Sequence, residues 1–403
     1  MKAAFTPEQD QEFQRRADAV CAAMRAAGLR QLVLTDTDNL FYLTGATFDA
    51  LERPFFLILG ADGGRQLVVP TLELDHLGKA WGAQDRVSTY REYPAPAGAT
   101  WHDALLGTGL LQPGFAFEPS LPLAMARVLL DAGGEPHELM EGIRIIKSAW
   151  EIAAIERAAH YADWGVQQIL RSASEGALVA ETFTPGQALS RKIIRETPDW
   201  DPVATRVICG AWPAPLSAEP HAIPRLDMTL NEGPHVAMVL TRVNGYAAES
   251  ERTFFTTRPD PRARELFHLL EAARERAFSL VRPGMHCSEL DWQVNRFLAG
   301  SGYAGDSVRL HRCGHGFGLG NHEPPWIAEG SEHVLQENMV ISIEPGIYLA
   351  GEGGYRHSDT VLVTANGYRC LTKAPIRLNE LVLGRPKLRH RLQRSLVRNA
   401  LNL

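Results

Sequence analysis

The chain has 403 residues, more than one ordinary hydrophobic core accommodates, so we expect two or three domains. Hydrophobic residues make up 45% and charged residues 22%, and the net charge of −6 argues against a nucleic-acid partner. No run of about 18 apolar residues occurs, so we expect no transmembrane helix and no membrane partner. Five cysteines without a CxxC pair, and a start without an apolar signal segment, favour a cytoplasmic location.

The first 145 residues show an alternation of helix and strand signals. Residues 7–28 predict a helix, with Pro7 as its first residue and Gly28 as its end. Apolar runs then predict buried strands at 32–36, 52–60 and 65–70. A Gly-Gly pair at 133–134 and a change of composition place a boundary near 140–147. We therefore expect an α/β domain over residues 1–145.

A second domain is expected over residues 146–385. Ser148 and Glu151 form a capping-box pattern, and apolar residues behind them recur at helical spacing. A second long helix is predicted from Asp260-Pro261. Each long helix is followed by a shorter one, at 186–197 and 287–299, and then by strand-rich sequence. This order of elements indicates two similar halves. Residues 386–403 are expected to form a basic helical tail on the surface rather than a nucleic-acid or membrane site.

The chemistry centres on a predicted β-hairpin over residues 236–257. Asn244-Gly245 is the preferred centre of a two-residue type I′ turn between two strands. On the second strand Glu249 and Glu251 are two residues apart, so both carboxylates point to one face. Two such carboxylates repel each other unless a cation or a proton lies between them. A solvated outer face is the alternative explanation of the pair.

Four histidines stand in loops rich in glycine and proline: His221, His311, His315 and His322. Such loops hold side chains in special positions, and imidazoles beside carboxylates commonly transfer protons near neutral pH. Glu344 ends an apolar strand, where a carboxylate would be buried and would need a partner.

The ordered motifs resemble the pita-bread fold family of creatinase, prolidase, aminopeptidase P and methionine aminopeptidase. They are His221, the hairpin from NGY to ERTF, HRCGHGFGLGNHEPP, ISIEPGIY and GGYR. NLFYLTG (39–45) is similar to the N-terminal domain of creatinase and prolidase, and IRIIKSAWEIAAI (143–155) to the start of the catalytic domain. The resemblance implies an α/β (α+β) chain, with a creatinase/prolidase-type N-terminal domain and a pita-bread catalytic domain of pseudo-twofold halves.

The resemblance also raises the question of whether this chain binds metal ions. The metallopeptidases of this family hold two ions with two Asp, one His and two Glu. Those positions are occupied here by Met238, Glu249, His315, Glu344 and Ser358. Met and Ser are poor ligands for a hard divalent ion, so we expect no dinuclear centre and no cofactor. If one Zn or Mn ion binds, the ligands expected are Glu249, His315 and Glu344.

Creatinase provides the other comparison, because that enzyme works without metal. The resemblance assigns catalytic roles to His221, Glu251, Glu344 and His315. Residues at substrate-binding and proton-shuttle positions are His311, His322, Tyr348 and Arg356. Arg53 matches an arginine that caps the substrate carboxylate from the neighbouring subunit, which implies a homodimer. Trp326 replaces creatinase's second carboxylate arginine, and its ring is expected to cover a cationic group of the substrate.

We therefore expect a hydrolase of a C–N bond in a small zwitterion, either an N-substituted amino acid or a short peptide. His221 would act as general acid and base in a creatinase-like reaction with little or no metal dependence. One alternative is an Xaa-Pro dipeptidase or aminopeptidase P that uses at most one ion. The other is a non-catalytic, peptidase-like binding module.

Overall fold

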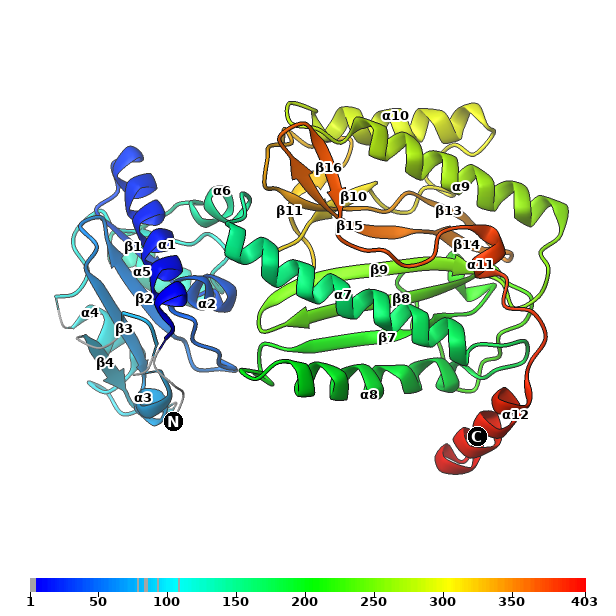
Figure 1. Ribbon diagram of the computed structural model, residues 1–403. Coiled ribbons are helices and arrows are strands. Elements are labelled where there is room, and N and C mark those ends of the chain that lie inside the picture. The colour runs from blue at the N-terminus through cyan, green and yellow to red at the C-terminus, as the bar shows by residue number, and fades with distance from the viewer. Residues whose placement is uncertain (1–4, 78–79, 83–85, 93, 108) are drawn as a thin grey trace. The chain divides into compact units, whose positions relative to one another are not determined.

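The computed structural model describes residues 5–77, 80–82, 86–92, 94–107 and 109–403. The chain divides into two compact units, one ending at Arg144 and the other beginning at Ile145, and each is described by itself (Figure 1). No helix in the described part of the chain has the length and apolar character needed to cross a membrane.

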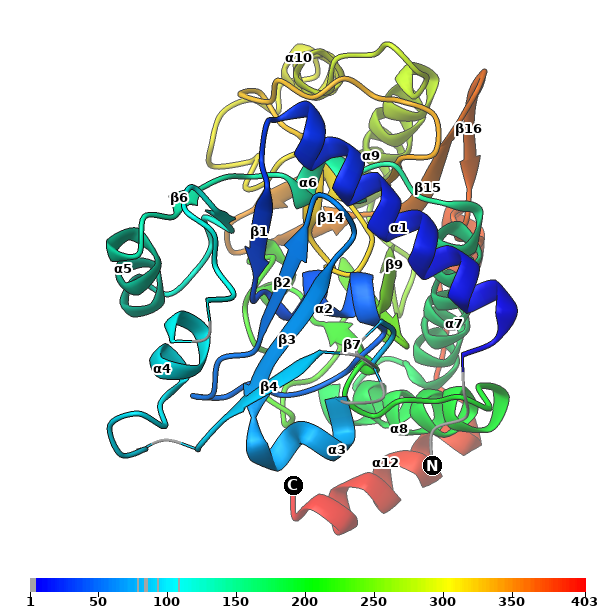
Figure 2. The ribbon, with the colours of Figure 1, turned by 90° about the vertical axis from the view of Figure 1, so that its left-hand side faces the viewer.

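Unit 1 is built on one six-stranded sheet. Its described helices are α1 (Pro7–Ala26), α2 (Thr37–Thr44), α3 (Leu74–Leu77), α4 (Trp101–Leu106), α5 (Leu123–Asp131) and α6 (Met140–Arg144). Its strands are β1 (Gln31–Leu34), β2 (Phe56–Gly60), β3 (Arg65–Pro70), β4 (Val87–Tyr90), β5 (Ala116–Phe117) and β6 (Glu135–Pro136). The strand order is β4-β3-β2-β1-β5-β6, and β1 to β4 are seen side by side in Figure 2.

Helices cover this sheet as the sequence predicts. Thr6 caps α1 through a reciprocal bond with Gln9, and Pro7 takes the first turn, where its missing N–H is not needed. On one side of the sheet, Leu105 of α4 and Leu129 of α5 are fully buried within the core formed by the strands. Helix α1 and strands β1, β2 and β3 confirm the predicted helix and the three predicted strands, with ends that differ by a few residues.

Unit 2 carries the second, larger sheet. Its described α-helices are α7 (Ala149–Ser172), α8 (Val179–Glu196), α9 (Pro261–Leu280), α10 (Cys287–Gly300), α11 (Leu378–Leu381) and α12 (Leu388–Leu401). Strands of the first half are β7 (Arg206–Trp212), β8 (His235–Val243) and β9 (Tyr246–Phe254). Strands of the second half are β10 (Gly314–Gly316), β11 (Glu323–Ile327), β12 (Val340–Ile343), β13 (Gly346–Leu349), β14 (Gly353–Arg356), β15 (Ser358–Thr364) and β16 (Gly367–Cys370).

The main sheet of unit 2 has the order β11-β10-β12-β15-β9-β8-β7, and β16 pairs with β15. Strands from both halves therefore join in one sheet, with β15 against β9 at the junction. Helix α7 runs along β8 and β9 (Figure 1). Ser148 caps α7 in the predicted capping box. This arrangement confirms the predicted α/β fold class.

Helix α8 differs from the prediction, because it begins at Val179 rather than at residue 186. Pro185 lies inside the helix, where proline removes one backbone hydrogen bond and normally ends a helix. The carbonyl that loses this bond belongs to Glu181, and Gln393 Nε2 of α12 donates to it over 3.4 Å. A partner from a segment distant in sequence thus compensates for the proline.

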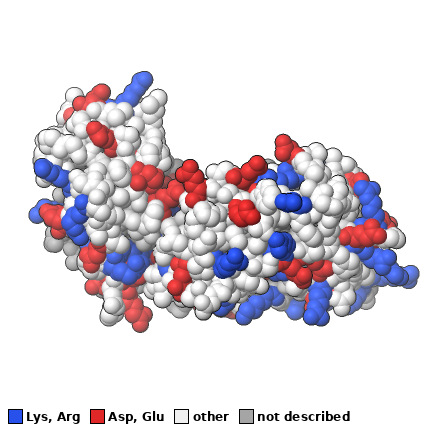
Figure 3. Space-filling model, turned by 90° about the horizontal axis from the view of Figure 1, so that it is seen from above, with Lys and Arg blue, Asp and Glu red and all other residues white. Residues whose placement is uncertain are grey.

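The basic tail forms helix α12, as predicted. Arg394 Nε lies 3.2 Å from Glu181 Oε1, and His390 contacts the carbonyl of Arg171 at 3.1 Å. Leu388, Leu392 and Leu396 are exposed. Acidic and basic side chains are intermixed over the face shown in Figure 3, as expected for a chain of modest net charge.

Candidate active site

The hairpin β8–β9 positions the two adjacent carboxylates. Asn244 and Gly245 have φ values of 46° and 95°, and the type I′ turn requires positive φ at both positions. Tyr246 and Ser250 point towards α7, where they hydrogen-bond Glu151 and Asp163. Because strand side chains alternate, Glu249 and Glu251 point to the opposite face. Both are buried, at 2% and 3% exposure, which rules out the solvated outer face.

His315 on β10 lies between two of the carboxylates. Its Nε2 atom is 3.2 Å from Glu344 Oε1 and 3.8 Å from Glu249 Oε1. Its Nδ1 atom donates to the carbonyl of Gly316 over 3.1 Å, so Nε2 is the ring atom that faces the carboxylates. Glu344 directly follows β12 and is buried, as predicted.

Electrostatics divides these carboxylates into two kinds. Burial and the neighbouring Glu344 raise the pKa of Glu249 to about 8. Burial also acts to raise the pKa of Glu344, but the charge and hydrogen bond of His315 outweigh it and hold that pKa below its usual value. For His315, burial lowers the pKa, but Glu344 overcomes this effect and raises it. The cluster therefore holds one ionised carboxylate, Glu344, and a second, Glu249, that keeps its proton near neutral pH without a further cation.

A second chain of contacts begins at Glu251. Its carboxylate forms a buried ion pair with Arg356 Nε, and Arg356 Nη1 donates to Tyr348 Oη over 3.3 Å. Tyr348 Oη is 2.6 Å from His311 Nε2. Because His311 Nδ1 donates to the carbonyl of Arg312, the neutral ring accepts the tyrosine proton at Nε2. Burial lowers the pKa of His311, which favours this neutral form.

The two positions that lack expected metal ligands lie on either side of Glu251. Met238 is directly opposite Glu251 on β8, and Ser358 is directly opposite it on β15. Ser358 Oγ donates to Glu249 Oε1 over 2.5 Å. The space of a second ion is thus surrounded by a thioether, a hydroxyl and the ion pair of Glu251 with Arg356.

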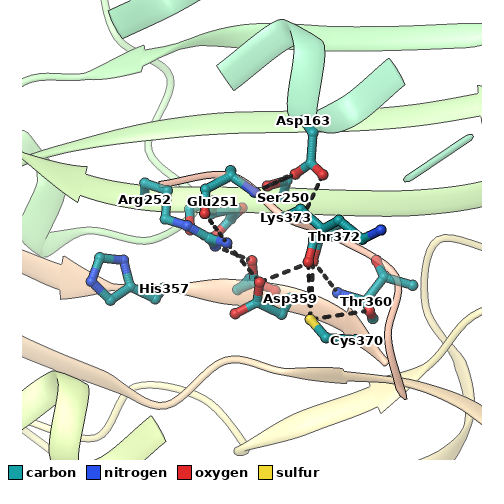
Figure 4. Close-up of polar contacts among 12 residues, drawn as sticks. Asp163, Ser250, Glu251, Arg252, His357, Asp359, Thr360, Cys370, Thr372 and Lys373 are labelled. Atoms are coloured by element: carbon teal, nitrogen blue, oxygen red, sulfur yellow. Dashed lines mark hydrogen bonds and ion pairs between the residues drawn. The ribbon is translucent and has the colours of Figure 1, made fainter. Parts of the chain in front are cut away.

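A buried polar cluster supports the two site strands from behind, as seen in Figure 4. Arg252 Nη1 donates to the carbonyls of Glu251 and Ser358, each over 2.7 Å. Asp359 accepts from Arg252 and Arg274, each over 2.6 Å. Burial acts to raise the pKa of Asp359, but the two guanidinium groups outweigh it and hold the carboxyl ionised. This cluster fixes β9 against β15.

The HEPP segment is held by a buried lysine. Lys147 Nζ lies 3.0 Å from Glu323 Oε1, and Glu323 Oε2 accepts from the Gly320 amide over 3.1 Å. The turn carries His322, whose ring centroid is 4.1 Å from that of His315. Burial, followed by the charge of His315, lowers the pKa of His322 to about 4, so its ring is neutral near pH 7. Sequence reasoning did not assign this positioning role to Lys147.

Three other predicted residues occupy different surroundings. His221 is exposed in a turn and lies near enough to His322 to influence its charge. Trp326 is directly opposite His315 on β11, and the Arg312 guanidinium lies 4.3 Å from the centre of its ring. The cation over Trp326 is therefore supplied by the chain, whereas we expected it from a substrate. Arg53, in unit 1, contacts Glu92 at 3.0 Å and Glu52 at 3.9 Å.

The residues around His315 fit one divalent ion. Glu249, His315 and His322 each offer a ligand atom, and these atoms lie within 4.8 Å of one another. His315 Nε2 is buried and faces two carboxylates, those of Glu344 and Glu249. A metal ion would satisfy this atom and would ionise Glu249. The geometry thus favours the one-ion alternative over our expectation of no cofactor, and it adds His322 to the candidate ligands.

Comparisons with known proteins show the family of this chain. Residues 137–365 match metallopeptidase family M24, and residues 16–145 match the creatinase/prolidase N-terminal domain. A probable dipeptidase, PepE, of Mycobacterium tuberculosis is 32% identical over 91% of this chain and 96% of its own length. An Xaa-Pro dipeptidase of Pyrococcus furiosus is 36% identical over 59% of this chain and 65% of its own length.

Solved structures of dipeptidases and prolidases are similar to this chain over most of its length. The crystal structure of dipeptidase PepE from Mycobacterium ulcerans has a TM-score of 0.79 at 29% identity and covers 95% of this chain and 100% of that one. The prolidase from Pyrococcus horikoshii has a TM-score of 0.74 at 24% identity, covers 90% of this chain and 99% of that one, and shows the fold alone. These relatives favour the peptidase alternative over the creatinase-like function that we expected first. The chain belongs to metallopeptidase family M24, within the group that includes creatinase and prolidase, and is a C–N bond hydrolase.

Proposed function

We propose that this protein is a dipeptidase that hydrolyses short peptides, including Xaa-Pro dipeptides, with one divalent ion. The observation that carries the proposal is the buried Nε2 atom of His315, which faces Glu344 at 3.2 Å and Glu249 at 3.8 Å. His322 adds a neutral imidazole at the same place. The relatives named as dipeptidases support a peptide substrate.

The ion, taken to be Zn or Mn, would be held by Glu249, His315 and either His322 or Glu344. When bound, it polarises the scissile carbonyl and makes water a stronger nucleophile. If His322 binds the ion, Glu344 is the ionised carboxylate placed to accept a proton from the attacking water. His322, if it does not bind the ion, is a neutral base close enough to share this task.

Arg356 and Glu251 have a different role in this proposal. Arg356 brings a fixed positive charge into the space that a second ion would require, and Glu251 balances it. The Tyr348 hydroxyl accepts from Arg356 and donates to His311, so it holds both side chains in place beside the site. A fixed guanidinium thus replaces part of the positive charge of a dinuclear centre, and it is the group that can stabilise a developing oxyanion.

Removing and restoring metal tests the proposal. The protein is dialysed against a chelator and assayed with Ala-Pro, Met-Ala and creatine before and after addition of Mn²⁺ or Zn²⁺. We expect peptide cleavage only after metal addition, with about one ion retained per chain. His315→Ala should lower kcat/KM by more than about 10²-fold, which exceeds the loss typical of partners outside the ligand sphere.

His268→Ala is the matched control, because His268 on α9 has a side chain that is 61% exposed. It should leave both activity and metal content unchanged. Peptide cleavage that survives in chelated protein, with no metal detected, would overturn the one-ion proposal.

The second candidate function is metal-independent hydrolysis of a creatinase-like substrate. It is favoured by one observation, the carboxylate of Glu251 between Met238 and Ser358, where the chain lacks two ligands of the family. Turnover of creatine or another guanidino or N-methyl amino acid by chelated protein would support it.

We also propose a homodimer, which rests on the resemblance of Arg53 to an arginine that works in a neighbouring site, and a cytoplasmic location, which rests on the five free cysteines. Sedimentation as a monomer at micromolar concentration would remove this part of the proposal.

A further inference from the structure

We propose that Arg312, held against the ring of Trp326, binds the free carboxylate of the substrate. The inference rests on the proposed peptidase function and specifies its substrate class. Peptides with a free carboxyl end would be preferred over peptides whose end is blocked.

Arg312 lies over Trp326, the residue that pairs with His315 in the sheet. Trp326 is directly opposite His315 in the antiparallel pair of β10 and β11, so both side chains stand on one face of the sheet. The guanidinium of Arg312 lies 4.3 Å from the centre of the Trp326 ring. Its charge also acts on His322. The cation is therefore placed on the same face as the candidate catalytic imidazoles.

The guanidinium of Arg312 has no carboxylate partner among the residues that the structure describes. Its Nε atom is buried and makes no hydrogen bond within that part of the chain. Other cations of unit 2 near these strands have acidic partners: Arg356 has Glu251, Lys147 has Glu323, and Arg309 has Asp291. Arg312 thus keeps its charge and its donors for a ligand.

The contact with Trp326 also leaves the Arg312 guanidinium suited to an anion. An arginine stacked on an aromatic ring keeps its planar edge free, because the ring face contacts the guanidinium plane and not its N–H groups. That edge matches a carboxylate, which accepts two parallel hydrogen bonds from it. Stacking on Trp326 also limits the side-chain freedom that would otherwise be lost on binding. The pair is a preorganised acceptor site for an anion.

The experiment compares Ala-Pro with Ala-Pro amide, which differ in the terminal charge. Both are measured for cleavage and for their effect on melting temperature, since any ligand of the folded state stabilises it. For the metal-loaded parent we expect kcat/KM to favour the acid by about 10- to 100-fold, the range for one charge-assisted pair. Arg312→Met should remove this preference through KM, with kcat and the amide reaction little changed. Arg312→Lys should restore part of it.

Arg282→Met is the control for loss of one positive charge, because Arg282 is exposed and has no role in the site. It should keep the parent's preference. A preference retained in Arg312→Met, or a parent that cleaves and binds acid and amide equally, overturns the inference. If neither compound is cleaved, the proposed peptidase function fails for this substrate. The melting temperatures then decide the role of Arg312: loss of acid selectivity in Arg312→Met supports it, and retention contradicts it.

Discussion

Ser358 donates a 2.5 Å hydrogen bond to Glu249, from a position where the metallopeptidases resembled by this chain carry a carboxylate. A second carboxylate at that position would repel Glu249 unless an ion lay between them. The hydroxyl instead stabilises Glu249 without one. In the proposed one-ion site, this hydroxyl takes the place of one ligand of a second ion.

Metal stoichiometry follows from this replacement. We expect the parent protein to retain about one ion per chain after dialysis, and two retained ions would contradict the assignment. The double variant Met238→Asp/Ser358→Glu restores oxygen ligands on both sides of Glu251, and its metal content should rise above that of the parent. Elemental analysis of both proteins under the same conditions measures the difference.

The ion pair between Glu251 and Arg356 makes a second prediction. Both side chains are buried, so Glu251→Ala leaves a guanidinium without its partner and should lower the free energy of unfolding by about 3–5 kcal/mol. Combining Glu251→Ala with Arg356→Met removes the unpaired charge and should recover much of this loss. Urea unfolding of the two single variants and the double variant measures the coupling. Losses that simply add in the double variant would show that the pair is not coupled.

His221 provides the third prediction, because it is exposed and its removal should not affect folding. If it transfers a proton in the reaction, His221→Ala should lower kcat by about 10²- to 10⁴-fold with an unchanged melting temperature. A steady-state assay beside a thermal scan measures both quantities. Activity within tenfold of the parent would assign the acid–base role to another residue, with Glu344 and His322 as the next candidates.

Acid sensitivity is the fourth prediction, and it concerns His235 at the start of β8. His235 Nδ1 accepts from the Ala214 amide over 3.0 Å, and Nε2 donates to the Asn231 carbonyl over 3.2 Å, so the ring is held neutral. Burial lowers its pKa from 6.5 to about 4. A base with a lowered folded pKa contributes stability that is present above pH 6.5 and is lost as the pH falls towards 4.

The loss at low pH should reach on the order of 3 kcal/mol. Urea unfolding at several pH values measures it, and His235→Gln should flatten the profile in this window. The exposed His268→Asn is the control and should retain the slope of the parent. An unchanged slope in His235→Gln would show that other groups, such as the buried His357, account for the acid sensitivity.

Local signals in the sequence predicted the elements that depend on neighbouring residues. The Asn244-Gly245 turn and the Ser148 cap need only a few adjacent positions, and both occur as expected. Helix α8 was predicted too short, because the group that compensates for Pro185 is Gln393, more than 200 residues away. A proline predicts the end of a helix reliably only where no distant group bonds the carbonyl that the proline leaves free.

The site itself was predicted only in part, because side chains from distant segments meet there. Local patterns singled out His315, Glu249 and Glu344, the family resemblance then grouped them, and the structure places them together. Arg312 was not identified, although it stands three residues before His315. Its stacking on Trp326 depends on how β10 pairs with β11, including a register shift between His315 and Gly316. Pattern alone does not reveal such a shift.

The two-residue turn at Asn244-Gly245 has a consequence for how this enzyme can change. It sets the phase of β9, so that odd-numbered residues meet the substrate side and even-numbered ones meet α7. With the rest of β9 shifted in step, deleting one residue there would put Ser250 and Arg252 in the places of Glu249 and Glu251, and inserting one would put Ala248 and Ser250 there. The length of a loop that touches no substrate thereby constrains the chemistry as strictly as the identity of the glutamates.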